Sequence, residues 1–141
     1  MPTFDKTAAE TLLTSVFAQW VQDLNLSIET IEGDSALLRM PFSEKLCRSN
    51  DVICGQALMS LADTAMVFAI CSAAGEYLPM TTVDQTTHFM RPAMRADVLA
   101  EARVVRLGKT MAYGSVSIRM DGDTRPVAMA QTAYALLRDG K

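Results

Sequence analysis

Near the N-terminus, large apolar side chains recur every three or four positions, with polar residues between them. The apolar positions are Leu12, Leu13, Val16, Phe17, Trp20, Val21 and Leu24. This spacing places them on one face of a helix, because an α-helix makes one turn every 3.6 residues. We therefore predict one amphipathic helix over residues 5–24.

After residue 24 the apolar residues no longer recur at helical spacing. Residues 26–32 and 35–41 are typical of two short strands joined by a turn at Gly33 and Asp34. Residues 42–53 are polar and irregular, which indicates a loop. Residues 54–74 are apolar on nearly every side, so they predict a buried helix, and Gly75 is well placed to end it.

Four strand-like segments complete the chain, at 81–90, 96–107, 111–120 and 125–137, separated by turn residues. In the third of them Val116, Ile118 and Met120 alternate with polar residues, which indicates one packed face and one wetter face. Consecutive hairpins predict a largely antiparallel sheet. Only the helix at 54–74 is apolar enough to lie inside the curve of that sheet.

Composition sets the class of protein. The chain has 141 residues and is 50% apolar, so we expect residues 1–141 to form a single domain with a full core. Its net charge of −3 argues against nucleic acid as a partner. Asp63 interrupts the longest apolar run and the N-terminus lacks a signal-peptide pattern, so we expect no membrane span.

The cysteines point to a reducing compartment. Cys47, Cys54 and Cys71 are odd in number and lack the paired C-x-x-C spacing of zinc sites. We therefore expect a cytoplasmic protein with no disulfide framework and no zinc site. We also expect no other metal and no organic cofactor.

Asp63 is the most informative residue. It lies in SLADTAMVFAI, whose apolar residues indicate burial, and an unpaired buried carboxylate costs several kcal/mol. Two explanations remain open from the sequence: a structural one, in which Asp63 pairs with a polar side chain or lies on a wet stripe, and a catalytic one.

Gly55 falls at the start of the same helix. Its free first-turn N–H groups form a site for an oxyanion, and a carboxylate together with such a site can perform acyl transfer. However, the eight residues between Gly55 and Asp63 separate them by roughly 12 Å along the axis. If two copies of the helix pack antiparallel about a twofold axis, Gly55 of one copy comes opposite Asp63 of the other, so activity would require a dimer.

Two segments carry a family resemblance. CGQALMSLADTAMVFAICSAAG (54–75) and HFMRPA (88–93) resemble the hotdog-fold acyl-CoA thioesterases of the phenylacetic-acid-degradation type; LADTA (61–65) and FMRP (89–92) are the most specific pieces. The resemblance covers nearly the whole chain. It implies an α+β hotdog fold, in which a curved antiparallel β-sheet wraps around one long central helix, here with an extra N-terminal helix. It also implies a homodimer or homotetramer that hydrolyses a thioester of coenzyme A or a related pantetheine carrier.

The resemblance also implies roles for single residues. Asp63 matches the acidic nucleophile or general base that acts on the thioester carbon, and Gly55 matches the glycine whose amide N–H polarises the thioester carbonyl. Thr82 matches a Ser or Thr that in some members holds the attacking water.

The chain departs from the family beside the thioester carbonyl. Cys54, Gly55 and Gln56 stand where the family usually has His-Gly-Gly. Arg48 stands where a hydrogen-bonding Asn or Gln is usual, and Asn50 is near enough to substitute. We expect these residues to line the substrate site. Four basic residues are candidates to contact the phosphates of coenzyme A: Arg91, Arg95, Arg106 and Lys109.

Several other readings remain open. A non-catalytic acyl-CoA-binding dimer is favoured by the missing His-Gly-Gly and disfavoured by Asp63. Cys54 could act as a nucleophile with His88, the only histidine. A dehydratase is disfavoured, because it would need a His and an Asp close together in a substrate loop, and the only candidates, Asp84 and His88, fall on a predicted strand. Strict alternation places Thr82, Asp84, Thr86 and His88 on one face of that strand.

Overall fold

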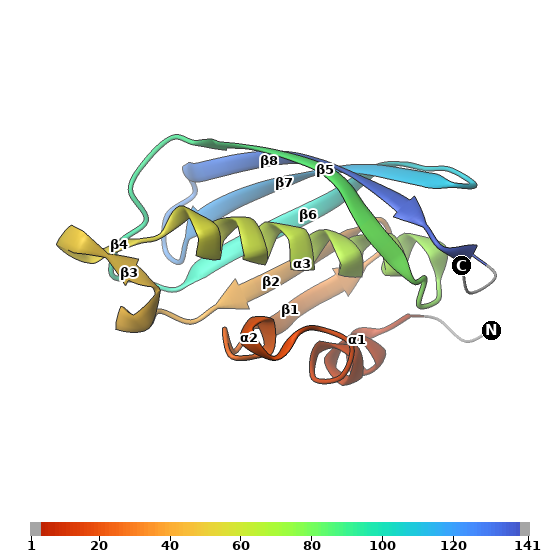
Figure 1. The fold of residues 1–141 in the computed structure, drawn as a ribbon, viewed down its shortest axis with the longest axis horizontal. Helices are drawn as coiled ribbons and strands as arrows, with labels where there is room; N and C mark the ends of the chain where they lie inside the picture. Colours follow the sequence, from red (N-terminus) through yellow and green to blue (C-terminus); the bar gives the residue numbers. More distant parts are fainter. Residues whose placement is uncertain (1–3, 139–141) are drawn as a thin grey trace.

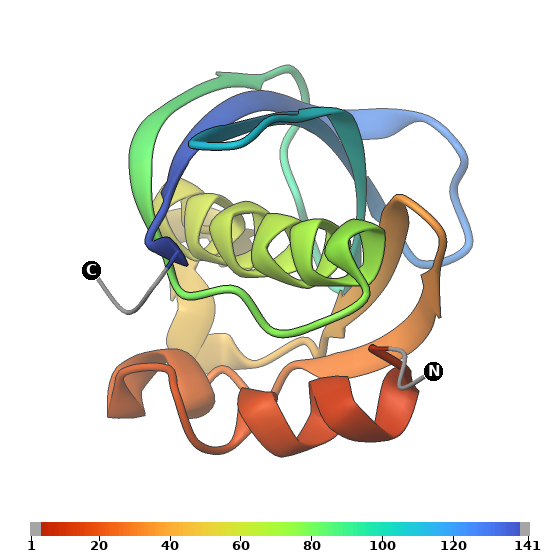
Figure 2. The same cartoon turned by 90° about the vertical axis from the view of Figure 1, so that its right-hand side faces the viewer.

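The computed structural model describes residues 4–138, which form a six-stranded antiparallel sheet wrapped around one long helix (Figures 1 and 2). The strands lie in the order β1-β2-β6-β7-β8-β5. Their bounds are β1 Ser27–Glu32, β2 Ser35–Met40, β5 Met80–Phe89, β6 Val98–Leu107, β7 Met111–Met120 and β8 Pro126–Leu136. This arrangement confirms the predicted fold class, and the strand bounds lie within two residues of the predicted ones.

The central helix α3, Gly55–Ala74, follows the prediction closely. Eleven of its side chains are buried, because the sheet curves around it. It ends at Gly75, whose φ of 77° is the left-handed conformation that glycine adopts without strain. By length and composition α3 could cross a membrane, but 61% of its most apolar stretch is buried within the protein.

The predicted single helix over residues 5–24 is wrong. The structure has two short helices, α1 at Lys6–Leu13 and α2 at Gln19–Gln22. They are separated after Thr14 and Ser15, whose hydroxyls donate to the carbonyl of Thr11 and so compete with helical hydrogen bonding. The break lets Phe17 turn inward, where its ring lies 5.7 Å from the ring of Phe68.

The segment before α3 is more ordered than predicted. It contains two 3-10 helices, Glu44–Leu46 and Ser49–Asp51, and a small ladder between β3, Cys47–Arg48, and β4, Val52–Ile53. Asn50 and Asp51 make the turn in the left-handed region, at φ values of 66° and 60°. Asn and Asp tolerate this region better than other non-glycine residues.

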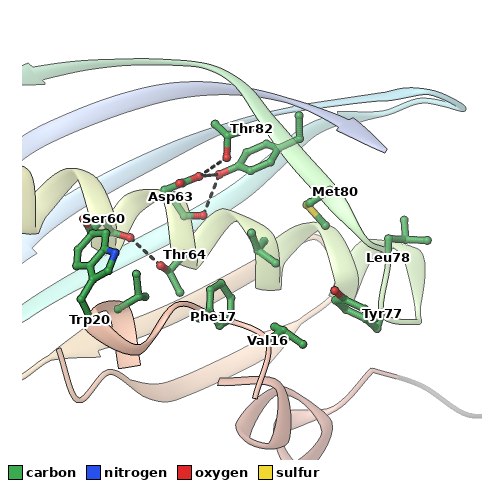
Figure 3. A pocket seen from close by; sticks show the side chains of 13 residues that line it. Val16, Phe17, Trp20, Ser60, Asp63, Thr64, Tyr77, Leu78, Met80 and Thr82 are labelled. Atoms are coloured by element: carbon green, nitrogen blue, oxygen red, sulfur yellow. Dashed lines mark hydrogen bonds between the residues drawn. The ribbon is translucent and has the colours of Figure 1, made fainter. Parts of the chain in front are cut away.

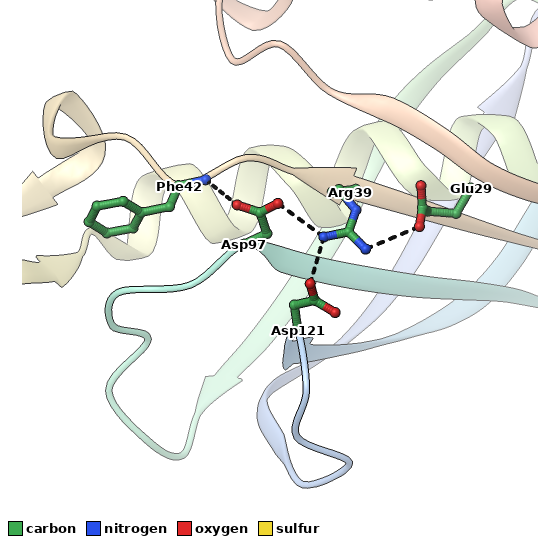
Figure 4. Close-up of polar contacts among 5 residues, drawn as sticks. All are labelled: Glu29, Arg39, Phe42, Asp97 and Asp121. Atoms are coloured by element: carbon green, nitrogen blue, oxygen red, sulfur yellow. Dashed lines mark hydrogen bonds and ion pairs between the residues drawn. The ribbon is translucent and has the colours of Figure 1, made fainter.

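An ion cluster ties this segment to the sheet (Figure 4). Arg39 on β2 contacts carboxylate oxygens of Glu29 at 3.2 Å, Asp97 at 3.0 Å and Asp121 at 2.9 Å. The other oxygen of Asp97 accepts a 2.8 Å hydrogen bond from the N–H of Phe42. That bond, together with Arg39, holds the pKa of Asp97 below its usual value. The cluster fixes where the chain leaves β2 and turns toward the start of α3.

Candidate functional site

Asp63 extends from the middle of α3 toward the inner side of β5 and β8 (Figure 3). Thr82 Oγ1 donates to Asp63 Oδ1 at 2.8 Å, and the Tyr134 hydroxyl lies 2.5 Å from the same oxygen and 2.8 Å from the Asp63 carbonyl. Within residues 4–138 no group donates to Oδ2. The carboxylate is therefore held through one oxygen, and the other is left for a ligand or water.

A β-bulge in β5 brings Thr82 to this position. Thr82 pairs with Tyr134 and Asp84 pairs with Ala133, so Val83 is an extra residue in the edge strand. Paired residues share a face, and Tyr134 faces the helix while Ala133 faces away. The prediction that Thr82 and Asp84 share a face is therefore wrong, because the bulge interrupts the alternation.

Tyr134 is the site residue that the sequence analysis missed. Its side chain is fully buried on the inner face of β8. Burial, together with the neighbouring Asp63 carboxylate, raises the pKa of its phenol well above the usual value, so the hydroxyl keeps its proton and stays a donor. The signal in the sequence was weak: one aromatic residue at an inward position of an alanine-rich strand.

A cavity of about 270 Å³ opens beside the Asp63 carboxylate. It is bounded by α3, by the chain from Tyr77 into β5, and by the segment that links α1 to α2 (Figure 3). Apart from Asp63, its described lining residues are uncharged. They are Val16, Phe17, Trp20, Val21, Ser60, Thr64, Val67, Tyr77, Leu78, Met80, Thr82 and Tyr134.

Gly55 lies in a different cavity, of about 430 Å³, at the start of α3. The cavity is also lined by Arg48, Phe89 and Arg91, so it carries two positive charges beside the glycine. A Cβ at position 55 would lie 3.2 Å from the Phe89 ring, so glycine allows this ring to pack closely. Within the described chain, no group accepts a hydrogen bond from the Gly55 N–H.

One copy of the chain therefore does not bring Asp63 and Gly55 together. They lie eight residues apart on one straight helix and line separate cavities, as the rise of the helix predicts. Gln56 lies between them, in a shallow groove that also includes Asp63 and Thr82.

The remaining predicted residues divide between the two ends of the molecule. Cys54 is half-buried at the N-cap of α3, and neither it nor Asn50 lines the two cavities. Arg95 pairs with Asp51 at 3.5 Å. Arg106 and Lys109 lie at the β6–β7 turn, at the end of the sheet away from Arg91, so the four basic candidates do not form one patch in a single copy.

The geometry disfavours the histidine-based sites. Asp84, Thr86 and His88 lie on the outer face of β5, away from α3, since His88 pairs with the outward-facing Met129. This separates His88 from Cys54, and it places the candidate dehydratase pair outside both cavities. Among residues 4–138 no three His, Cys, Asp or Glu side chains group as metal ligands.

Comparisons with known proteins agree with this architecture. The family model described as Thioesterase superfamily matches residues 51–127. A candidate esterase of Halobacterium salinarum is 32% identical over 127 residues, covering 82% of this chain and 83% of the relative. The crystal structure of a candidate thioesterase from Silicibacter is 26% identical with a TM-score of 0.84, covering 96% of this chain and 94% of the other.

A more distant structure has the same fold. The PaaI protein from the phenylacetic acid degradation operon of Escherichia coli superposes with a TM-score of 0.78 at 22% identity, covering 93% of this chain and 94% of the other. Together these matches identify the architecture as the hotdog fold.

Proposed function

We propose that this chain, which belongs to the thioesterase superfamily, hydrolyses acyl thioesters of coenzyme A and is of the phenylacetic-acid-degradation type. Its membership of the superfamily supports thioester hydrolysis as the general reaction. One observation carries the proposal: a carboxylate held through a single oxygen, by Thr82 and Tyr134, at the edge of a cavity lined by both hydroxyl-bearing and apolar side chains. The motifs LADTA and FMRP support the subgroup.

In the proposed reaction, Asp63 Oδ2 takes a proton from water while the water oxygen attacks the thioester carbon. Direct attack by the carboxylate is the alternative first step. The tetrahedral oxyanion accepts a hydrogen bond from the Gly55 N–H. Collapse of the intermediate breaks the carbon–sulfur bond, and the thiolate of coenzyme A takes up the proton held by Asp63. Thr82 positions Asp63, since its hydroxyl donates to the carboxylate, and its oxygen can also accept a hydrogen bond from the attacking water.

We further propose that the glycine comes from a second copy, as Gly55 of the partner subunit. The separate cavities of Asp63 and Gly55 support this arrangement. So does the free edge of β5, where Val83, Phe89 and Met59 of the adjacent helix expose apolar surface. A twofold axis along this edge would create two identical sites.

The two arginines beside Gly55 are the proposed contacts for coenzyme A. Arg48 and Arg91 line the same cavity and have guanidinium groups suited to phosphate oxygens. A non-catalytic acyl-CoA-binding dimer is the second candidate, favoured by Cys54 and Gln56 in place of the usual His-Gly.

Release of free thiol from a panel of acyl-CoAs tests the proposal. Asp63→Asn preserves the shape of the side chain and still accepts from Thr82 and Tyr134, yet it removes the base. We expect a loss of at least a hundredfold in kcat, whereas Asp84→Asn, on the outer face of β5, should be unaffected. Binding without turnover by the wild type would favour the binding protein, and full activity in Asp63→Asn would refute the catalytic role.

A further inference from the structure

The cavity beside Asp63 has a polar end and an apolar end. Asp63, Thr82 and Tyr134 meet at the polar end, where their groups bond to one another. The hydroxyls of Ser60 and Thr64 also lie along the helix wall, but each donates to a helix carbonyl at 2.8 Å. Beyond them the walls are formed by Val67, Tyr77, Leu78 and Met80, of which only Tyr77 carries a polar group. A ligand that reaches Asp63 from this side therefore meets apolar surface.

The N-terminal segment closes the apolar end. Val16, Phe17 and Trp20 face α3 across the cavity (Figure 3), and Val21 also lines it. Phe17 anchors this segment through its contact with Phe68, and the Gln22 side chain donates to the Phe17 carbonyl at 2.8 Å. The segment is thus held in place, although the side chains of Val16 and Trp20 remain 47% and 60% exposed.

Size and charge limit what this cavity can hold. A cavity of about 270 Å³ is smaller than the roughly 300–1,000 Å³ of pockets that hold drug-sized ligands, so it suits a short or medium-length chain or one ring. None of the described lining residues is basic, and Asp63 would repel a second carboxylate.

We propose that this cavity binds the acyl group of the substrate. Val67 and the N-terminal segment 16–21, which forms the floor of the cavity, set the maximum length of the acyl chain. The inference rests on the proposed thioesterase function and names its substrate class: uncharged acyl groups of up to about eight carbons, or one aromatic ring. Long-chain acyl groups and acyl groups with a terminal carboxylate are excluded, the first by volume and the second by charge.

Val67→Phe tests the proposal, because it adds a ring to the wall one helical turn beyond Asp63. The ring removes room for about three methylenes, and each excluded methylene costs about fourfold in affinity for the apolar wall. In wild type, kcat/KM should rise from acetyl-CoA to octanoyl-CoA and fall at palmitoyl-CoA. In Val67→Phe, the ratio of octanoyl-CoA to butyryl-CoA activity should fall at least tenfold.

Val105→Phe is the matched control, since it makes the same change at a position of β6 that is 72% exposed. It should leave the ratio unchanged. Val16→Phe is a second test at the partly exposed floor, in case Val67→Phe does not fold. An unchanged ratio in a folded Val67→Phe or Val16→Phe protein would overturn the proposal.

Calorimetry separates this proposal from the catalytic one. Titration with octanoyl-CoA in the Asp63→Asn background, in which cleavage is slowed, and with coenzyme A measures binding separately from turnover. Weaker octanoyl-CoA binding in Val67→Phe, with coenzyme A binding unchanged, would support the acyl cavity even if wild type showed no turnover. Equal binding of octanoyl-CoA by both proteins would refute the cavity while leaving hydrolysis a separate question.

Discussion

The proposed oxyanion donor can be removed with little change to the fold. Gly55 is the first residue of α3, a position where proline is favoured because its N–H has no helical partner. Cys54 before it has φ −66° and ψ 149°, the extended conformation that a residue preceding proline adopts. Gly55→Pro therefore removes one N–H at a site whose backbone already suits proline.

The expected loss follows from the role of that N–H. Removing one oxyanion donor costs about 10²–10³ in kcat. Gly55→Ala is the matched control, because it crowds the Phe89 ring with the same Cβ, at 3.2 Å, but keeps the N–H. We expect Gly55→Ala to lose less than tenfold, and Gly55→Pro to lose a hundredfold or more, in a thiol-release assay. Equal activities in two folded variants would refute the assignment of the donor.

Mixed dimers test the partner arrangement directly. If each site takes Asp63 from one subunit and glycine from the other, a dimer of one Asp63→Asn and one Gly55→Pro subunit has one intact site and one doubly defective site. Random mixing of the two inactive proteins should restore about a quarter of wild-type activity, since about half the dimers are mixed and each has one of two sites. No recovery after demonstrated subunit exchange would contradict a shared site.

Three further outcomes follow from contacts described above. Tyr134→Phe removes one hydrogen bond to a charged group, so kcat should fall by about 10- to 100-fold with little change in KM. Steady-state kinetics on octanoyl-CoA would measure both constants, and an equal rise in KM would contradict a positioning role for Tyr134. Asp97→Asn should lower the free energy of unfolding by about 1 kcal/mol at pH 7, a modest figure because the carboxylate is partly exposed. Because the pKa of Asp97 is lowered by folding, its stabilising effect is present above about pH 4 and is lost as the pH falls through the folded pKa. Urea titrations should therefore show the difference in free energy of unfolding between Asp97→Asn and wild type shrinking toward about pH 3. A difference that stays constant with pH would argue against this role. Gly114→Ala should destabilise by about 1–3 kcal/mol in thermal unfolding, because the new Cβ would lie 2.9 Å from the carbonyl oxygen of Arg103 and would also meet Met66; unchanged stability would mean that the helix moves away freely.

The sequence predicts the parts of this fold that depend on composition over many residues. The burial of α3 follows from an apolar run that no other segment matches, and the hairpins follow from their turn residues. The break after Thr14 depends instead on local hydroxyl hydrogen bonds, and the helical spacing of the apolar residues continues across it.

The candidate site was predictable only in part. Asp63 stood out as a charge in an apolar helix, and Thr82 was found through the family resemblance alone. The bulge at Val83 carries no turn residue, so strict alternation grouped Thr82 with Asp84, which the structure places on the opposite face. Tyr134 lies 71 residues from Asp63 in the chain, and only the register of β8 brings the two side chains together.

The break in the N-terminal helix places the residues proposed to select the acyl group in a different part of the chain from those proposed to carry out the reaction. The stretch shared with the superfamily, residues 51–127, contains Gly55, Asp63 and Thr82 but not the floor at residues 16–21. Substitutions at Val16 and Trp20 alter partly exposed side chains and leave the buried sheet and α3 intact. Under the proposed function, the range of acyl groups accepted can therefore change with little loss of stability and without altering Gly55, Asp63 or Thr82.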